Sequence, residues 1–166
     1  FASYLLDQVP VDMPLVIPII KKLLQRCGST IQIVVLPRYK EQIDILENEF
    51  RQEIFVPSKV VDGPSLLSHS SLFVGAGGTM TAESALLGVP TISCYPARPT
   101  LIEKFLVEKK LVLRVTNPEM VVRQAIKIIG KPRKWHQSFK EKAEKVTSEM
   151  ENPIDVIMRG VSKEFS

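Results

Sequence analysis

The chain has 166 residues, of which 45% are apolar and 24% charged, so it is long enough for one domain with a substantial core, and extended disorder is excluded. No apolar run approaches the roughly 20 residues of a membrane-spanning helix, and the N-terminus does not have the order of a signal peptide, so we expect a cytoplasmic protein. A net charge of +4 is compatible with nucleic acid, anionic lipid or phosphorylated small molecules as ligands.

The first part of the chain contains two helical patterns and several strand-like segments. Apolar residues recur at helical spacing over 14–27, and Gly28 follows as a C-terminal cap. Residues 31–36 form an almost continuous apolar run, which is typical of a strand buried on both faces of a parallel sheet. The other elements predicted here are a helix at 39–50 and short strands at 53–56 and 59–61.

The second part of the chain continues the alternation with connections of a few residues. Asn117 is the predicted N-cap of a helix that continues to Ile129, where Gly130 and Pro132 end it. Two further helices are predicted to finish the chain. The remaining predicted elements are helices at 64–70, 80–87 and 101–107 and strands at 72–75, 90–95 and 111–115.

This alternation of strands and helices predicts an α/β fold, a Rossmann-like parallel sheet with helices on both faces. We expect residues 1–166 to form a single domain. Sheets of this kind bind ligands beyond the carboxyl ends of their strands. The loops predicted to line that crevice follow Leu36, Val61, Gly75 and Tyr95.

The most informative segment, residues 72–90, reads LFVGAGGTMTAESALLGVP: a strand, three glycines in four residues, the start of a helix and a Gly-Val-Pro end. Gly75, Gly77 and Gly78 allow positive φ and remove the Cβ atoms that would keep a phosphate from the main-chain amides. The helix that follows directs its free N–H groups and the positive end of its dipole at the same place. A diphosphate is therefore the predicted ligand.

Polar side chains near the helix start extend this prediction. Thr79 and Thr81 add hydroxyl donors, and Glu83 can accept hydrogen bonds from a ribose diol. The alternative is a plain strand-to-helix turn in which Glu83 interacts only with the helix dipole. An NAD site is disfavoured because Met80 stands where the dinucleotide fingerprint needs its third glycine, and a Walker loop is disfavoured because no Gly-Lys-Ser or Gly-Lys-Thr follows.

The order Gly-Gly-Thr, a glutamate five residues after the second glycine, and Leu-Gly-Val-Pro resembles the donor-site signature of GT-B glycosyltransferases. More narrowly, residues 61–96 resemble an uncharacterised, mainly archaeal family of predicted glycosyltransferases that is also similar to UDP-N-acetylglucosamine 2-epimerase; they read VDGPSLLSHSSLFVGAGGTMTAESALLGVPTISCYP. Weaker similarity covers 36–38 and 103–112. Members of that family often carry a basic residue where this chain has Ala82.

The resemblance implies the C-terminal half of a GT-B enzyme, in which the nucleotide of an NDP-sugar, expected to be UDP, lies between two domains. It implies no metal or other cofactor, because the helix N-terminus itself offsets the charge of the departing diphosphate. The implied donor contacts are Gly77, Gly78, Thr79 and Met80 for the diphosphate, Glu83 for the ribose, and Val61, Asp62 and Gly63 for the nucleobase.

Other candidates come from their places at predicted strand ends. Arg38 is placed to meet a phosphate or a sugar carboxylate at the crevice mouth, or to form a surface ion pair. Tyr95 and Arg98 lie in the loop that would face the donor sugar. Glu103 is another candidate for sugar hydroxyls, although an exposed helix glutamate is the commoner finding. His69 is read as a capping or surface residue rather than a catalytic base.

The basic stretch 131–145, with Trp135 and Phe139 interleaved, could dock on anionic lipid or nucleic acid. Glu141 and Glu144 among the bases favour an ordinary surface helix instead. We therefore expect no nucleic-acid partner, and peripheral association with a membrane stays open.

The predicted function is binding of an NDP-sugar donor by a hexosyltransferase domain that is inactive by itself. Because the resemblance implies the C-terminal half of a GT-B enzyme, we expect the chain to need a partner N-terminal domain, in cis or in trans, which would hold the acceptor and any general base; its start at Phe1 is compatible with a fragment of a longer protein. One alternative is a 2-epimerase acting on UDP-N-acetylhexosamine, whose signature has paired glutamates after the glycines where this chain has only Glu83. The other alternative is a subunit that binds nucleotide sugars without turnover.

Overall fold

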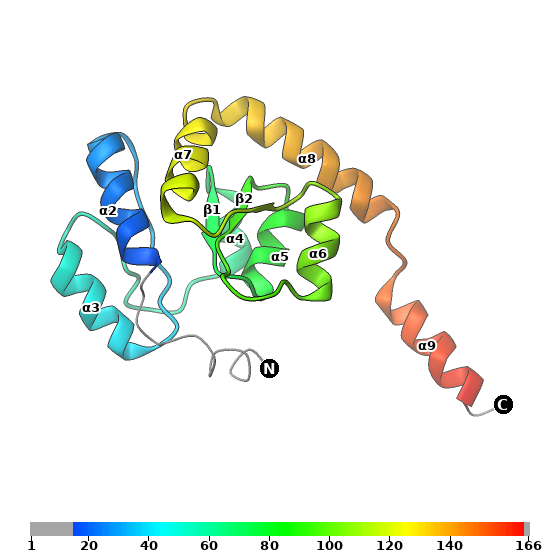
Figure 1. The fold of residues 1–166 in the computed structure, drawn as a ribbon. Helices are drawn as coiled ribbons and strands as arrows, with labels where there is room; N and C mark the ends of the chain where they lie inside the picture. Colours follow the sequence, from blue (N-terminus) through cyan, green and yellow to red (C-terminus); the bar gives the residue numbers. More distant parts are fainter. Residues whose placement is uncertain (1–14, 165–166) are drawn as a thin grey trace.

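The computed structural model describes residues 15–164, and at its centre lies a parallel sheet with the strand order β1-β2-β3 (Figure 1). Each strand is connected to the next by a helix, α5 (Thr79–Leu86) and then α6 (Leu101–Glu108), because parallel neighbours need a crossover. In the register, Phe73 lies opposite Thr91, and Ile92 opposite Leu113. The three strands are β1 (Phe73–Gly75), β2 (Thr91–Ser93) and β3 (Leu113–Arg114).

The alternating side chains of the central strand β2 show that helices cover both faces of the sheet. Ile92 packs toward α2 and α7 on one face. On the other face, the hydroxyls of Thr91 and of Ser84 in α5 lie 2.8 Å apart, and Ser93 donates to Glu103 of α6. The predicted α/β fold with a parallel sheet between two helical layers is therefore confirmed.

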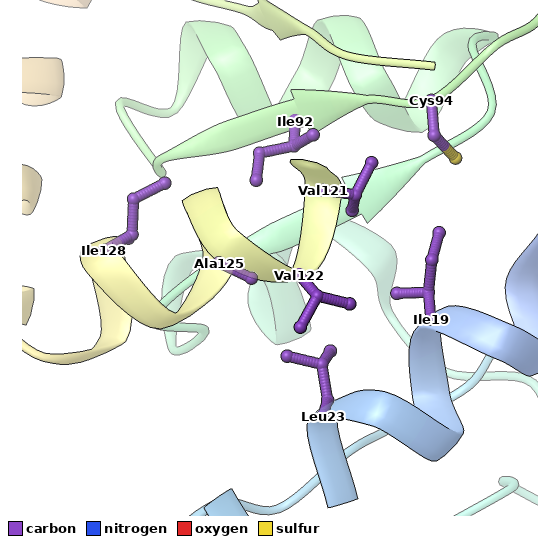
Figure 2. Packing of buried hydrophobic residues seen from close by; sticks show 8 residues of the cluster. All are labelled: Ile19, Leu23, Ile92, Cys94, Val121, Val122, Ala125 and Ile128. Atoms are coloured by element: carbon purple, nitrogen blue, oxygen red, sulfur yellow. The ribbon is translucent and has the colours of Figure 1, made fainter. Parts of the chain in front are cut away.

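The largest part of the core joins α2 (Val16–Cys27) and α7 (Pro118–Ile129) to β2 (Figure 2). As predicted, Asn117 caps α7 by accepting a hydrogen bond from the amide of Met120. Burial of each large aliphatic side chain contributes roughly 1.5–3 kcal/mol. The start predicted for the first helix, at Pro14, lies outside the described residues. The buried side chains of this cluster are Ile19, Leu23, Ile92, Cys94, Val121, Val122, Ala125 and Ile128.

On the opposite face, α8 (Pro132–Ser148) packs against α5 and α6 through Ala143 and Val146. The chain turns sharply between α5 and β2 at Gly88, which has φ +74°. At this turn the backbone of α8 approaches so closely that a Cβ atom on Gly88 would lie 2.7 Å from the Cα atom of Lys140. The glycine of the Gly-Val-Pro sequence therefore serves the packing of α8.

The segment before β1 contains less strand than the pattern predicts. The predicted strands at 31–36 and 53–56 are reduced to one parallel bridge between Val34 and Phe55, next to α3 (Lys40–Phe50). The strand predicted at 59–61 is wrong, and Val60 is fully exposed. Val-Val is a good strand sequence, but strand propensity yields a strand only where a neighbouring backbone pairs with it. The short elements of this region are η1 (Gly28–Thr30) and α4 (Gly63–Ser68).

The last helix, α9 (Pro153–Glu164), extends away from the body (Figure 1), and every side chain over 151–162 is exposed. Ile154, Ile157 and Met158 are each more than half exposed, so they add little to the core. Among the described residues, no helix is long and apolar enough to cross a bilayer.

We therefore expect that a chain ending at residue 152 keeps its thermal unfolding midpoint within about 2 °C. One kcal/mol shifts the Tm of a domain of this size by roughly 2–4 °C, and α9 supplies less than that to the body. Differential scanning calorimetry of both chains measures this shift. A fall of more than about 5 °C would show that α9 packs against the domain in solution.

Candidate functional site

The loop between β1 and α5 leaves main-chain amides uncovered at the start of the helix. Gly77 and Gly78 have φ values of +81° and +84°, and Gly78 is the N-cap of α5 with no side-chain cap. In the described part of the chain, no backbone or side-chain oxygen accepts from the amides of residues 78–81, the N-cap and the first three residues of the helix. A Cβ atom on Gly78 would meet no protein atom within 4 Å. These amides are open to a ligand.

Two of the predicted site residues hold this loop from the inside. A Cβ atom on Gly75 would lie 2.5 Å from the ring of Phe73 and 2.8 Å from Oγ1 of Thr81, so this glycine serves internal packing. The buried Thr81 hydroxyl donates to the carbonyl of Gly77 at 3.0 Å. Its hydroxyl is thus engaged within the protein, whereas Thr79 is exposed.

Glu83 lies one turn into α5 and is half-buried. Its carboxylate makes no hydrogen bond or ion pair with any of the residues 15–164, which is unusual for a partly buried charge. The carboxylate is therefore available to hydroxyl donors of a ligand. Glu83 and the open amides belong to the first two turns of the same short helix.

The segment 61–63 reaches the same helix start although it is not a strand. A Cβ atom on Gly63 would lie 4.0 Å from the terminal methyl carbon of Met80. The Asp62 carboxylate accepts from the amide of Ser65 at 3.3 Å and caps α4, so its position is fixed by a structural contact. Val61 is 37% exposed. The structure thus brings this segment next to the loop.

Tyr95 lies on the other side of the loop. Its side chain is 7% exposed, and a Cβ atom on Gly77 would lie 3.5 Å from its ring. The Tyr95 hydroxyl is buried and has no hydrogen-bond partner among the described residues. Arg98, three residues later, is exposed. The loop after β2 therefore contacts the loop after β1, as the carboxyl edge of a parallel sheet predicts.

Sequence reasoning missed a polar cluster at the ends of β2 and β3. Ser93 Oγ donates to Glu103 Oε1 at 2.5 Å, and Arg114 Nε lies 3.7 Å from the same oxygen. Glu103 is only 5% exposed, so the expectation of an exposed helix glutamate was wrong. The only signal in the sequence is Arg114 itself, a basic residue at the end of the apolar run Leu-Val-Leu.

Cys94 lies between this cluster and the core, and burial raises the pKa of its thiol. The nearby Glu103 carboxylate raises the Cys94 pKa further, whereas a hydrogen bond to the Cys94 backbone lowers it. The thiol is therefore protonated at neutral pH and shielded from solvent. Cys27 is the other free cysteine among the residues described, and it is only half-buried.

A family model described as "Protein of unknown function (DUF354)" matches residues 1–164. The chain belongs to the DUF354 family. Over 113 residues it is 37% identical to "Uncharacterized protein MJ0665" of Methanocaldococcus jannaschii. That match covers 68% of this chain and 32% of the relative, so this DUF354 chain spans about a third of the length of the relative.

Among solved structures, the fold of this DUF354 chain is similar to a crystal structure titled as the glycotransferase of kitacinnamycin. The sequences are 12% identical, and the TM-score is 0.48. The similarity covers 75% of this chain and 35% of the other chain.

Two other residues that the sequence analysis considered in this DUF354 chain, Arg38 and His69, make no hydrogen bond, ion pair or ring contact with the loop among the described residues. Arg38 is exposed at the start of α3, where Gln42 accepts from its amide and its guanidinium lies 5.8 Å from the ring of Tyr39. None of the contacts in the described residues joins Arg38 to the loop. His69 is exposed, and its Nδ1 lies 2.8 Å from the carbonyl of Ser65.

The basic stretch 131–145 lies largely on α8. Phe139 is buried, whereas Trp135 is half-buried. A surface hollow of about 340 Å³ is lined by Trp135 and three lysines, and another of about 240 Å³ lies between α2 and α3. Neither hollow includes a residue of the β1–α5 loop.

Proposed function

We propose that this chain binds an NDP-sugar, with UDP as the nucleotide, at the start of α5 and is the donor-binding half of a glycosyltransferase. The observation that carries this proposal is the presence in one helix of open amides at residues 78–81 and of the Glu83 carboxylate, which has no partner among residues 15–164. In this arrangement the amides hold the diphosphate, and Glu83 accepts from the ribose hydroxyls. Gly63 and Val61 border the nucleobase.

The electrostatics of the helix start suit a diphosphate better than a neutral ligand. The dipole of α5 places the equivalent of about half a positive charge at these amides. A hydrogen bond from an amide to a charged oxygen is worth roughly 1.5–3 kcal/mol. Two or three such bonds give roughly 3–9 kcal/mol before the loss of ligand freedom, whereas micromolar binding needs about 8 kcal/mol, so the ribose and nucleobase contacts must supply the rest.

The same field assists the transfer step. As the bond between the anomeric carbon and the diphosphate oxygen breaks, its electron pair stays on the departing UDP, and the acceptor oxygen forms the new bond. Fixed amides stabilise that growing negative charge without reorganising. The proton of the acceptor goes to a base, which we place in the partner domain.

We propose that a second domain, in cis or in trans, covers the bound donor and supplies the acceptor site. The Gly78 position is open, and the chain corresponds to only 32% of its relative. A site between two domains would be half-open in one domain alone. By itself this domain is therefore expected to bind the nucleotide without turnover.

Calorimetric titration with UDP, GDP, ADP and NAD tests the binding proposal. We expect saturable binding of UDP, weaker binding of GDP and ADP, and none of NAD, whose pyrophosphate site needs the third glycine that Met80 replaces. Absence of any diphosphate binding, or binding of NAD as tight as that of UDP, would contradict the proposal. Product analysis with UDP-N-acetylglucosamine and the partner domain then separates transfer, epimerisation and binding without turnover.

The Glu83→Ala variant is expected to bind UDP at least about 10-fold more weakly, because the loss of even one charge-assisted bond to the ribose costs roughly 1.5–3 kcal/mol. Inorganic pyrophosphate, which has no ribose, should bind both proteins alike. In the wild type, 2′-deoxy-UDP should bind more weakly than UDP, and in the variant the two should be equal.

The matched control is Glu108→Ala, which removes an exposed helical glutamate from α6 and should leave all affinities unchanged. If Glu83→Ala weakens the binding of pyrophosphate as much as the binding of UDP, Glu83 acts on the loop and does not contact the ribose.

A further inference from the structure

The loop after β2 is held in shape by a single side chain from the next strand. Arg114 Nη2 donates to two carbonyls of this loop, that of Tyr95 at 3.1 Å and that of Ala97 at 2.7 Å. Pro96 and Pro99 have no amide hydrogen, so the loop has few main-chain donors with which to satisfy its own carbonyls. Arg114 supplies the missing donors.

Arg114 is itself held by the buried carboxylate of Glu103. Glu103 Oε1 accepts from Ser93 Oγ at 2.5 Å and lies 3.7 Å from Arg114 Nε. The backbone amide of Glu103 donates to Thr100, the N-cap of α6. The carboxylate, the end of β2 and the start of α6 are therefore fixed relative to the guanidinium.

This arrangement is poorly explained by a contribution to overall stability. Burying an ion pair removes water from both charges, and apolar side chains of similar volume often give equal or greater stability. Arg114 Nε is also buried without a hydrogen-bond partner among the described residues. An apolar pair could not donate hydrogen bonds to two carbonyls of the loop, as the guanidinium of Arg114 does.

The held loop borders the proposed ligand site on one side. The Tyr95 ring lies against Gly77 of the β1–α5 loop, and Arg98 follows Ala97 directly in the chain. A shift of the Tyr95 and Ala97 carbonyls would move both side chains together.

We propose that Arg114, held by Glu103, is a positioning residue that sets the loop 95–98 for recognition of the sugar part of an NDP-sugar. The inference rests on the proposed function, because it assigns the diphosphate to the α5 amides and the sugar to this neighbouring loop. Arg114 acts through the loop and need not touch the ligand.

The Arg114→Met variant tests this role, with Arg123→Met as the matched control. Arg123 is an exposed arginine of α7, so the control removes the same charge without touching the loop. In titrations, Arg114→Met should weaken UDP-N-acetylglucosamine at least about 10-fold and UDP less than about 3-fold. The affinity of Arg114→Lys for UDP-N-acetylglucosamine should lie between those of the wild type and of Arg114→Met, because one ammonium cannot replace the guanidinium fork.

Equal weakening of both ligands, or weakening of neither, would overturn the positioning role. A merely structural residue would weaken both ligands in proportion to the loss of stability. Wild-type protein that binds neither ligand would instead refute the proposed function, and the next measurement then decides the inference.

That measurement is the rate at which Cys94 reacts with a thiol reagent, in a Cys27→Ser background. Cys94 precedes the loop and is 3% exposed, so its modification reports opening of the loop without any ligand. We expect modification at least about 10-fold faster in Arg114→Met than in Arg123→Met, measured well below the Tm of either variant so that global unfolding does not contribute. Equal rates would overturn the inference whether or not a ligand binds.

Discussion

Gly78→Val is expected to lower UDP affinity by at least about 100-fold. The native φ of +84° and ψ of −173° lie in a region that is essentially restricted to glycine, so a side chain forces the loop to rearrange. The valine would also fill the open space in front of the amides. Loss of two hydrogen bonds to the diphosphate, at roughly 1.5–3 kcal/mol each, gives a change of this size.

Gly28→Val is the matched control for this prediction. Gly28 also has positive φ, at +53°, and open space at its Cβ position, but it caps the C-terminal end of α2 and not the start of α5. Both variants carry a similar backbone strain of about 1–3 kcal/mol, and only Gly78→Val should lose UDP in calorimetry. Unchanged UDP affinity in a folded Gly78→Val variant would show that these amides do not bind UDP.

Gly88→Ala is expected to lower the free energy of unfolding by about 3 kcal/mol or more. The alanine Cβ would stand 2.7 Å from the backbone Cα of Lys140, and backbone atoms of α8 cannot swing aside as a side chain can. The φ of +74° adds strain for any residue with a Cβ atom. At roughly 2–4 °C per kcal/mol, Tm should fall by about 6–12 °C.

The control for the fold is Gly160→Ala in α9, where a Cβ atom meets nothing within 4 Å. Alanine favours helix over glycine by roughly 1 kcal/mol, so this variant should leave Tm equal or slightly raised. Equal Tm values for Gly88→Ala and wild type would mean that α8 can shift away from α5. In that case the close approach of α8 would not explain the glycine at position 88.

The helices could be predicted from the sequence because their signals are local. Apolar spacing and caps such as Asn117 and Gly28 depend on residues a few positions apart, and both caps are present in the structure. The strand at 59–61 could not be judged in this way. Whether Val60 and Val61 form a strand depends on a partner backbone, and no neighbouring strand meets them in the described structure.

The sequence by itself determined the glycine loop, because glycines before a helix allow the positive φ of this turn and leave the first amides of the helix uncovered. Tertiary structure alone decided which residues surround the loop. Ser93 and Arg114 lie opposite each other at the ends of the parallel strands β2 and β3, and Glu103 reaches both from the start of α6. A charge is buried or exposed according to the elements packed around it, and no local pattern records that packing.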